Sequence, residues 1–147
     1  ADRHLVDYPD DSFDYVLLSQ TLQAVRSPRE VLLQMLRLAD TTIVSFLNYG
    51  HWAARWSMVT RGRMPHTRAL STPWFETPNI HPCTVKDFMD LTRILKLGTG
   101  RAYGLAKERE VTTITHGFEG QANLFAEQAV FELLRPQQPK GKKRRPA

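Results

Sequence analysis

Residues 12–23 have the sequence SFDYVLLSQTLQ, and this stretch decides the fold class. The segment Tyr15–Leu18 is almost wholly apolar and ends abruptly in the small or polar residues Ser19, Gln20 and Thr21. An apolar strand without polar alternation is normally covered on both faces, as in a parallel sheet flanked by helices. Ligands of such sheets gather at the carboxyl ends of the strands, so these three polar residues are expected where a cofactor would bind.

The next elements predict that this strand opens a βαβ unit. Ser27 and Pro28 are typical of a helix start, and Glu30 is placed to complete a capping box. Residues at helical spacing form the apolar stripe of this helix: Val31, Leu32, Met35, Leu36 and Ala39. The β-branched segment Thr41–Phe46 predicts a second strand. A strand, a helix of about twelve residues and a strand give two parallel strands with a right-handed crossover.

A helix followed by a long loop is predicted next. Residues 52–60 have helical composition. One face of this helix carries three apolar side chains: Trp52, Trp56 and Val59. Residues 61–82 are irregular and contain four prolines and two adjacent aromatic residues. We expect this segment to be a lid or substrate loop, because a free linker would not carry exposed aromatic side chains.

Thr84 and Asp87 form a second capping-box pattern, which predicts another helix. Its apolar face is made by four residues: Phe88, Leu91, Ile94 and Leu95. Gly98 and Gly100 are interpreted as the end of this helix.

Two closing strands are predicted over residues 111–115 and 128–134, where β-branched and apolar residues return. The twelve residues between them are too few for a helical crossover, so we expect the two strands to form an antiparallel pair.

The charge of the chain is concentrated at its end. The chain has 147 residues, enough for one domain and a tail, and a net charge of +5. Residues 135–147 carry six Lys and Arg and no acid, which leaves 5 − 6 = −1 for residues 1–134. This basic tail has no core-forming residues and is expected to be disordered. We favour a solubilising role over RNA binding, because no aromatic residue stands among the charges to stack on bases.

The remaining bulk features favour a cytoplasmic protein without membrane spans. A single cysteine, Cys83, cannot form an internal disulfide, which fits a reducing cytoplasm. No apolar stretch is long enough to cross a bilayer. The first residues, ADRHL, do not resemble a signal peptide, and the missing initiating methionine favours a chain cut from a longer one.

Parallel strands with helices between them, closed by an antiparallel pair, resemble the second half of a class I methyltransferase fold that uses S-adenosylmethionine. Residues 7–16, DYPDDSFDYV, resemble the stretch ahead of the fourth strand in that superfamily. Further segments, in the right order, resemble consecutive signatures of the methionine-biosynthesis protein family MetW: residues 18–23, 45–52, 61–65, 77–81 and 123–131. The resemblance spans residues 1–134 and is weakest over 98–110.

This resemblance implies that residues 1–134 form a partial domain whose N-terminal, cofactor-binding half is missing. In the family pattern, the glycine-rich turn and the acid that holds the ribose lie upstream of Ala1. Asp2 is the candidate for the acid that faces the adenine. We expect the fragment to expose an unpaired apolar edge at Tyr15–Leu18, to be poorly soluble, and not to bind S-adenosylmethionine by itself.

The resemblance also implies where small molecules bind. Ser19, Gln20 and Thr21 would border the methionine end of the cofactor, the alternative being a polar turn that caps the strand. Five polar residues are expected to converge over the same sheet edge as substrate-binding groups: Asn48, Tyr49, His51, Asn79 and His81. A histidine there is a candidate general base, although a lone loop histidine is more often structural.

Other constellations favour simpler interpretations, and the sequence identifies no catalytic residue. His81 and Cys83 lack an accompanying CxxC or HxxxH pair, so we expect no metal site. Arg61 and Arg63 suit an acidic ligand and a solvated loop equally well. The strand end lacks the Asn-Pro-Pro-Tyr type of sequence used by enzymes that methylate nucleobase amino groups, which disfavours base methylation.

Three hypotheses for function follow. The first, implied by the resemblance, is a MetW-like protein of methionine biosynthesis that supports homoserine O-acetyltransferase (MetX) as its partner. The alternative is a small-molecule methyltransferase that uses S-adenosylmethionine, and whether methyl transfer occurs is left open. The weakest is an RNA-associated protein that binds through its basic tail.

Overall fold

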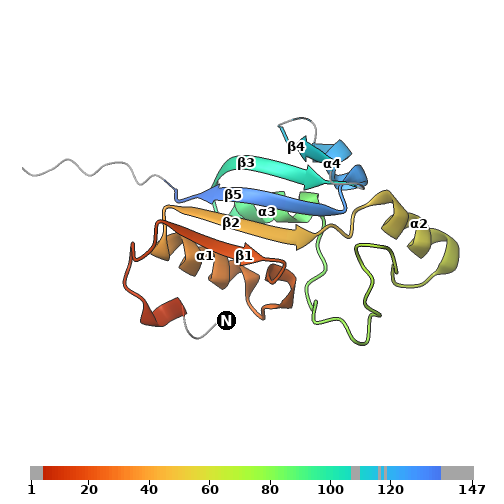
Figure 1. Cartoon of the computed structure of the whole chain (residues 1–147), viewed down its shortest axis with the longest axis horizontal. Helices are drawn as coiled ribbons and strands as arrows, with labels where there is room; N and C mark the ends of the chain where they lie inside the picture. The colour runs from red at the N-terminus through yellow and green to blue at the C-terminus, as the bar shows by residue number, and fades with distance from the viewer. Residues whose placement is uncertain (1–4, 107–109, 116, 118, 137–147) are drawn as a thin grey trace, which may run out of the picture.

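A five-stranded mixed sheet forms the centre of the computed structural model, which describes residues 5–106, 110–115, 117 and 119–136 (Figure 1). The strands are β1 (Tyr15–Ser19), β2 (Thr41–Leu47), β3 (Gly98–Leu105), β4 (Val111–Thr113) and β5 (Gln128–Leu134). The helices are α1 (Pro28–Leu38), α2 (Trp52–Arg61), α3 (Val85–Ile94) and α4 (Glu119–Phe125), with 3-10 turns at Leu5–Asp7 and Leu22–Ala24. The strand order across the sheet is β1-β2-β5-β3-β4.

The predicted βαβ unit is confirmed. Strands β1 and β2 are parallel, with Tyr15 opposite Thr41 and Ser19 opposite Ser45, and α1 connects them. The predicted capping box at the start of α1 is wrong, because the Ser27 side chain makes no cap hydrogen bond. The Ser27 carbonyl instead accepts the Val31 amide at 3.1 Å. Pro28 brings no amide to the helix start, so one fewer donor there needs a partner.

The capping box of α3 forms as predicted. The Thr84 hydroxyl accepts the Asp87 amide at 3.2 Å, and the Asp87 carboxylate accepts the Thr84 amide at 2.9 Å. The helix ends before the glycines that were expected to stop it. Lys96, at φ 54°, makes the left-handed turn that follows α3. Gly98 and Gly100 instead belong to β3.

The carboxyl-terminal antiparallel pair is confirmed, but its members differ from those predicted. Strand β5 pairs antiparallel with β2 on one side and with β3 on the other. The predicted strand 111–115 is the short β4, which pairs with β3 and not with β5. The segment between β4 and β5 holds α4, so these two strands are not a hairpin. The pairing of β3 with β5 is irregular between Thr99 and Ala102, and the Glu132 carboxylate accepts the Arg101 amide at 2.9 Å there.

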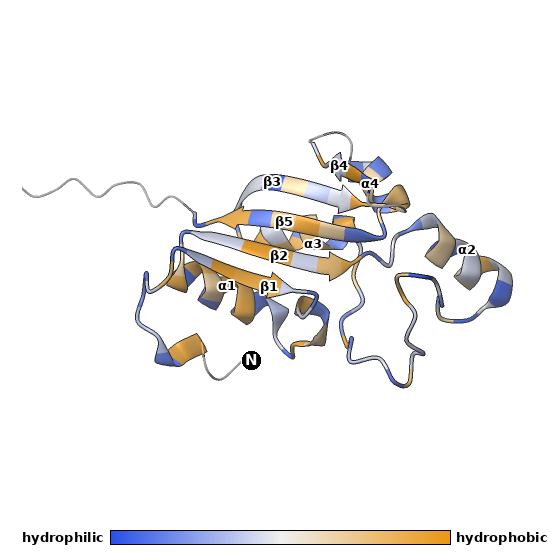
Figure 2. Ribbon diagram, viewed as in Figure 1, coloured by the Kyte–Doolittle hydropathy of each residue, from blue (hydrophilic) through white to orange (hydrophobic). Residues whose placement is uncertain are grey.

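Helices α1 and α3 cover one face of the sheet, and the core lies between them and the strands (Figure 1). Val44, Phe46, Phe131 and Leu133 point from the sheet into this layer and are fully buried. Phe88 of α3 meets them, with ring centroids 4.7 Å from Phe46 and 4.9 Å from Phe131. Apolar residues recur along β1, β2 and β5 (Figure 2).

The opposite face of the sheet is open in the described part of the chain. Tyr15 and Leu17 lie on it and are each 66% exposed, so the expectation that β1 is covered on both faces is wrong for this structure. Among the described residues, β1 pairs only with β2, which confirms the predicted unpaired apolar edge. The β1 edge and the open face are therefore both uncovered in the described part of the chain.

Arg135, predicted as the first residue of the tail, is part of the fold. Its guanidinium donates to the Leu36 carbonyl at 2.6 Å and forms ion pairs with Asp11 and Asp40 at 2.6 and 3.1 Å. These contacts tie the end of β5 to the end of α1. The other basic residues of the predicted tail, in 137–147, and the candidate Asp2 lie outside the described residues.

Candidate functional site

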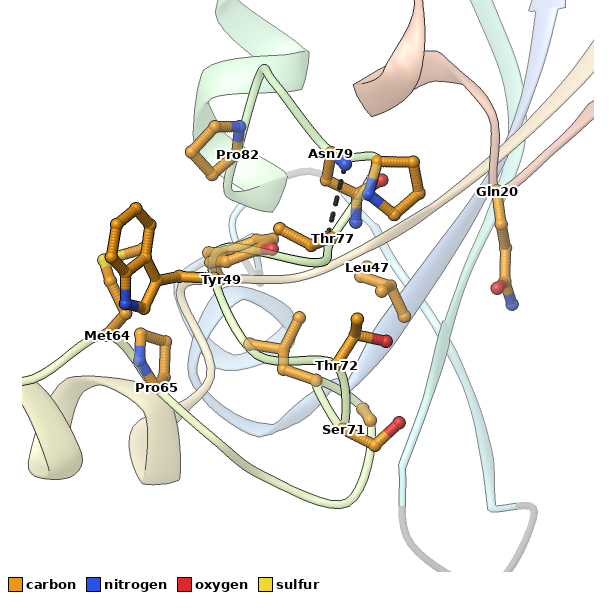
Figure 3. A pocket seen from close by; sticks show the side chains of 14 residues that line it. Gln20, Leu47, Tyr49, Met64, Pro65, Ser71, Thr72, Thr77, Asn79 and Pro82 are labelled. Atoms are coloured by element: carbon orange, nitrogen blue, oxygen red, sulfur yellow. Dashed lines mark hydrogen bonds between the residues drawn. The ribbon is translucent and has the colours of Figure 1, made fainter.

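A pocket lies at the carboxyl ends of β1 and β2, where the sequence predicts a ligand site. The loop from 62 to 82 folds opposite these strand ends (Figure 1) and supplies most of the pocket wall. The enclosed volume is about 410 Å³, within the usual range for small-molecule sites. The described residues that line it are Gln20, Leu47, Tyr49, Met64, Pro65, Ala69, Leu70, Ser71, Thr72, Trp74, Thr77, Pro78, Asn79 and Pro82 (Figure 3). The loop predicted as a lid or substrate loop thus lines this pocket, and its role stays a prediction.

Of the three residues predicted to border the cofactor, Gln20 lines the pocket. Its backbone has φ 51°, a left-handed conformation, and its amide donates to the Ser45 carbonyl at 3.0 Å. Its side-chain amide donates to Gln128 at 3.1 Å, which fixes the turn to the start of β5. Ser19 and Thr21 are exposed beside it, and the Thr21 hydroxyl donates to the Ser19 carbonyl at 2.7 Å. Those two residues form the polar turn itself.

Asn48 is an interior anchor of the site. It is 1% exposed, and its side-chain amide donates to the carbonyls of Asn123 and Ala126 at 2.9 and 2.7 Å. Its side-chain oxygen accepts the amides of Gly50 and Val85 at 2.9 and 3.2 Å. Because both ends of the side chain are engaged, Asn48 holds the end of β2 against α3 and α4 and fixes the position of Tyr49.

Tyr49 and Asn79 are brought together at the pocket as predicted. The Tyr49 amide donates to the Cys83 carbonyl at 3.1 Å, which joins the end of β2 to the far end of the loop. The Asn79 amide donates to the Thr77 hydroxyl at 3.2 Å (Figure 3). The side chains thus come from two segments about thirty residues apart in sequence.

The two histidines predicted for the same site lie in other cavities. His51 caps α2, and its Nδ1 accepts the Ala53 amide at 3.3 Å. It lines a cavity of about 740 Å³ between α2, α4 and β4, which we call the α2 cavity. Burial lowers the pKa of His51, an effect that Glu127 partly opposes. This neutral form suits an acceptor role at the helix end. His81 is exposed, with Nε2 3.2 Å from the Arg26 carbonyl.

Sequence reasoning missed Gln23, which holds the loop in place. Gln23 is buried, and its side chain donates to the Leu47 carbonyl at 3.0 Å and accepts the Leu47 amide at 3.2 Å. Its own carbonyl accepts the amides of Ile80 and His81 at 2.8 and 2.9 Å. A glutamine between apolar neighbours in the segment Leu22–Ala24 was the available signal, since a buried amide must find several partners.

Helix α2 is confirmed, but its apolar stripe faces outward. Trp52, Trp56 and Val59 are exposed, whereas Ala54 is its buried residue. The exposed Arg61 lines the α2 cavity. Arg63 lies with Met64 and Trp74 around a hollow that adjoins the pocket at the strand ends. In the described ranges, no cluster of three His, Cys, Asp or Glu residues is placed to hold a metal, and no helix is long and apolar enough to cross a membrane.

The pocket fits S-adenosylmethionine only in part. None of the described residues that line it is charged, so it offers no carboxylate for ribose hydroxyls. The methionine end of such a molecule carries a carboxylate and an ammonium group, and none of the described lining residues has a charge to pair with either. We therefore derive no methyl-transfer step from these residues.

Solved structures with the same fold define the class of protein. An S-adenosylmethionine-dependent methyltransferase from Thermotoga maritima, described as a possible histamine N-methyltransferase, has a TM-score of 0.59 at 16% identity and covers 86% of this chain. A methyltransferase from Archaeoglobus fulgidus that depends on the same cofactor has a TM-score of 0.57 at 10% identity and covers 90%. The chain covers 57% and 64% of these two proteins. The fold is thus that of a class I methyltransferase.

Within this class, the chain belongs to the MetW family, since the family described as "Methionine biosynthesis protein MetW" matches residues 1–133. A curated relative from Rhodopirellula baltica, "Bifunctional methionine biosynthesis protein MetXA/MetW", is 42% identical over 83 residues. The match takes in 56% of this chain and 13% of that longer protein.

Proposed function

We propose that this chain acts in methionine biosynthesis as a methyltransferase-fold subunit that supports homoserine O-acetyltransferase (MetX). The observation that carries the proposal is the similarity to a relative whose name joins MetXA and MetW in one bifunctional protein. Two activities joined in one chain are held at a high effective concentration, which is also what a stable complex of separate chains achieves.

The surface of the molecule supports a partner-binding role. Trp52 and Trp56 on α2, Trp74 and Phe75 on the loop, and Phe125 on α4 are all exposed. Aromatic side chains, tryptophan above all, are enriched at the energetic centres of protein interfaces. Trp74 lines the pocket at the strand ends, whereas Trp52, Trp56 and Phe125 line the α2 cavity.

The test is to co-express the chain with MetX from the same organism and to measure both association and acetyl transfer to homoserine. We expect the two proteins to co-purify and the acetylation rate to rise when the chain is added. The same chain, thermally unfolded, is the control for non-specific protein effects. Separate elution together with an unchanged rate would remove the partnership.

We propose S-adenosylmethionine binding only for a protein that also carries the glycine-rich turn and the ribose-binding acid of the family pattern. Ser19, Gln20 and Thr21 would then border the methionine end of S-adenosylmethionine, with Asp2 near the adenine. In a calorimetric titration we expect no heat from this chain, and heat from a form that also carries a glycine-rich turn and a ribose-binding acid. Heat from the short chain would show that the described pocket suffices.

A cytoplasmic location is proposed on the chemistry of Cys83. Its thiol is free, and oxidising compartments favour paired cysteines. Fractionation of the native cells is the corresponding measurement.

A further inference from the structure

The geometry points to an uncharged small molecule as the ligand of the pocket at the carboxyl ends of β1 and β2. The described residues that line this pocket are apolar, hydroxyl-bearing or amide-bearing, and none carries a formal charge. The inference concerns the pocket alone and does not depend on the partnership with MetX.

The absence of charge among these lining residues determines what can enter. A carboxylate or an ammonium group that leaves water must recover its hydration energy from an opposite charge or from several aligned hydrogen bonds. The walls offer scattered hydroxyl and amide groups, which satisfy a neutral polar group but not an ion. A molecule with an unpaired charge is therefore disfavoured relative to its neutral isostere.

Polar and apolar side chains share the wall of the pocket. Met64 and Pro65 stand on one side and Gln20 on the other (Figure 3). The hydroxyl groups of Tyr49 and Thr72 also stand in this wall (Figure 3). A ligand in the pocket would meet them. The fitting molecule has an apolar body and one neutral group that donates or accepts a hydrogen bond.

The wall is formed before any ligand arrives, because hydrogen bonds hold the loop at several points. The Thr67 amide donates to the Leu70 carbonyl at 3.0 Å, and the Leu70 amide donates to the Thr67 hydroxyl at 3.2 Å. The Thr77 amide donates to the Pro73 carbonyl at 3.0 Å, and Gln23 holds the loop beyond Asn79. A preformed wall lowers the ordering cost of binding.

The α2 cavity provides a contrast within the same molecule. Its lining includes Arg61 and Arg68 as well as Glu110 and Glu127, so it offers both signs of charge. A charged probe that binds this protein is expected there. The residues whose NMR signals shift therefore show which of the two cavities a probe occupies.

The test uses three probes that share one thioether chain and differ in the terminal group. They are 3-(methylthio)propan-1-ol, which is neutral, 3-(methylthio)propanoate, which is anionic, and 3-(methylthio)propan-1-amine, which is cationic at neutral pH. Each is titrated into the full chain up to millimolar concentrations, and binding is followed by two-dimensional NMR at the side-chain amide of Gln20, which lines this pocket and is kept in every variant. We expect the alcohol to shift this signal. Both charged probes should bind the pocket more weakly, by about tenfold or by a larger factor.

Two variants locate and sharpen the effect. Trp74→Ala is expected to weaken alcohol binding about tenfold, whereas Trp56→Ala, which removes a similarly exposed indole from the α2 cavity, leaves it unchanged. Asn79→Asp adds one carboxylate to the pocket with almost no change of shape, and should shift preference toward the amine.

Several outcomes would overturn the inference. They are a charged probe that binds as tightly as the alcohol when followed at Gln20, no shift of Gln20 with any probe, or a loss of binding in Trp56→Ala equal to that in Trp74→Ala. A negative probe result does not bear on the partnership with MetX, and a negative co-purification result does not bear on the ligand of the pocket.

Discussion

The two faces of the sheet are built from the same strands and have opposite surroundings. In β2, the residues Thr42, Val44 and Phe46 point toward α1 and α3 and are fully buried. The alternate residues, such as Ile43 and Leu47, point to the open face and remain partly exposed. Because side chains alternate along a strand, this difference arises within one seven-residue segment.

The comparison shows that apolar character alone does not distinguish the faces. The covered face packs aromatic rings into a core, whereas the open face presents Tyr15, Leu17 and Ile43 without a helix over them in the described residues. The covered face therefore accounts for the stability of this unit. The open face and the β1 edge are the surfaces on which further chain or a second molecule would add to the sheet.

Breaking the covered face should have the largest effect. Phe131→Ala removes a ring that packs on Phe46 and Phe88, and is expected to cost about 3–5 kcal/mol of unfolding free energy. Val130→Ala, the next residue on the open face, should cost about 1 kcal/mol or less. Urea unfolding followed by circular dichroism measures both, and the milder Phe131→Leu keeps the series measurable if Phe131→Ala does not fold. Equal losses at 130 and 131 would show that the two faces do not differ.

The covered side also protects Cys83, whose thiol packs at the rim of the core. Burial raises the pKa of Cys83 from 9.0 to about 11, with Asp87 adding to the effect and the hydrogen bond from Gln23 opposing it. Since the thiolate is the reactive form, alkylation by iodoacetamide near neutral pH should be about a hundredfold slower in the folded chain than in urea. The rate is measured by mass spectrometry. Native alkylation as fast as that in urea would place Cys83 outside the covered layer.

A smaller effect is expected from an unpaired hydroxyl in the covered face. The Thr42 hydroxyl is fully buried and has no hydrogen-bond partner among the described residues. Thr42→Val replaces it with a methyl group of similar size and should raise the free energy of unfolding by about 1 kcal/mol. Thr41→Val, on the open face, should change it by about 0.5 kcal/mol or less. A loss of stability in Thr42→Val would indicate a partner for this hydroxyl.

The parts of the fold predicted from sequence are those with local signals. The apolar run Tyr15–Leu18, the proline at 28 and the β-branched segment at 41–46 each specify their element within a few residues. Strand β3 was missed because its sequence, GTGRAYGL, contains three glycines and little alternation. What makes it a strand is its pairing with β5, about thirty residues away, and no local pattern encodes that pairing.

The candidate site divides in the same way. Gln20, Tyr49 and Asn79 were predicted because the carboxyl ends of parallel strands share an edge. Asn48 follows β2 just as Tyr49 does, but its partners are carbonyls 75 and 78 residues further along the chain, so its burial was not predictable. His51 was placed at the pocket on sequence proximity, yet the start of α2 directs it into a different cavity.

The open face offers the smallest effect on stability and the sharpest test of association. Leu17→Lys places a charge on the β1 edge, where lysine opposes pairing of strands between molecules. Because Leu17 is exposed, we expect a stability change of about 0.5 kcal/mol or less, together with reduced self-association in sedimentation velocity. Ile94→Lys adds the same charge at an even more exposed position, 72% exposed, on α3. If both substitutions reduced self-association equally, the net charge of the chain and not the β1 edge would control it. The uncovered edge would then not be the surface through which the molecules associate.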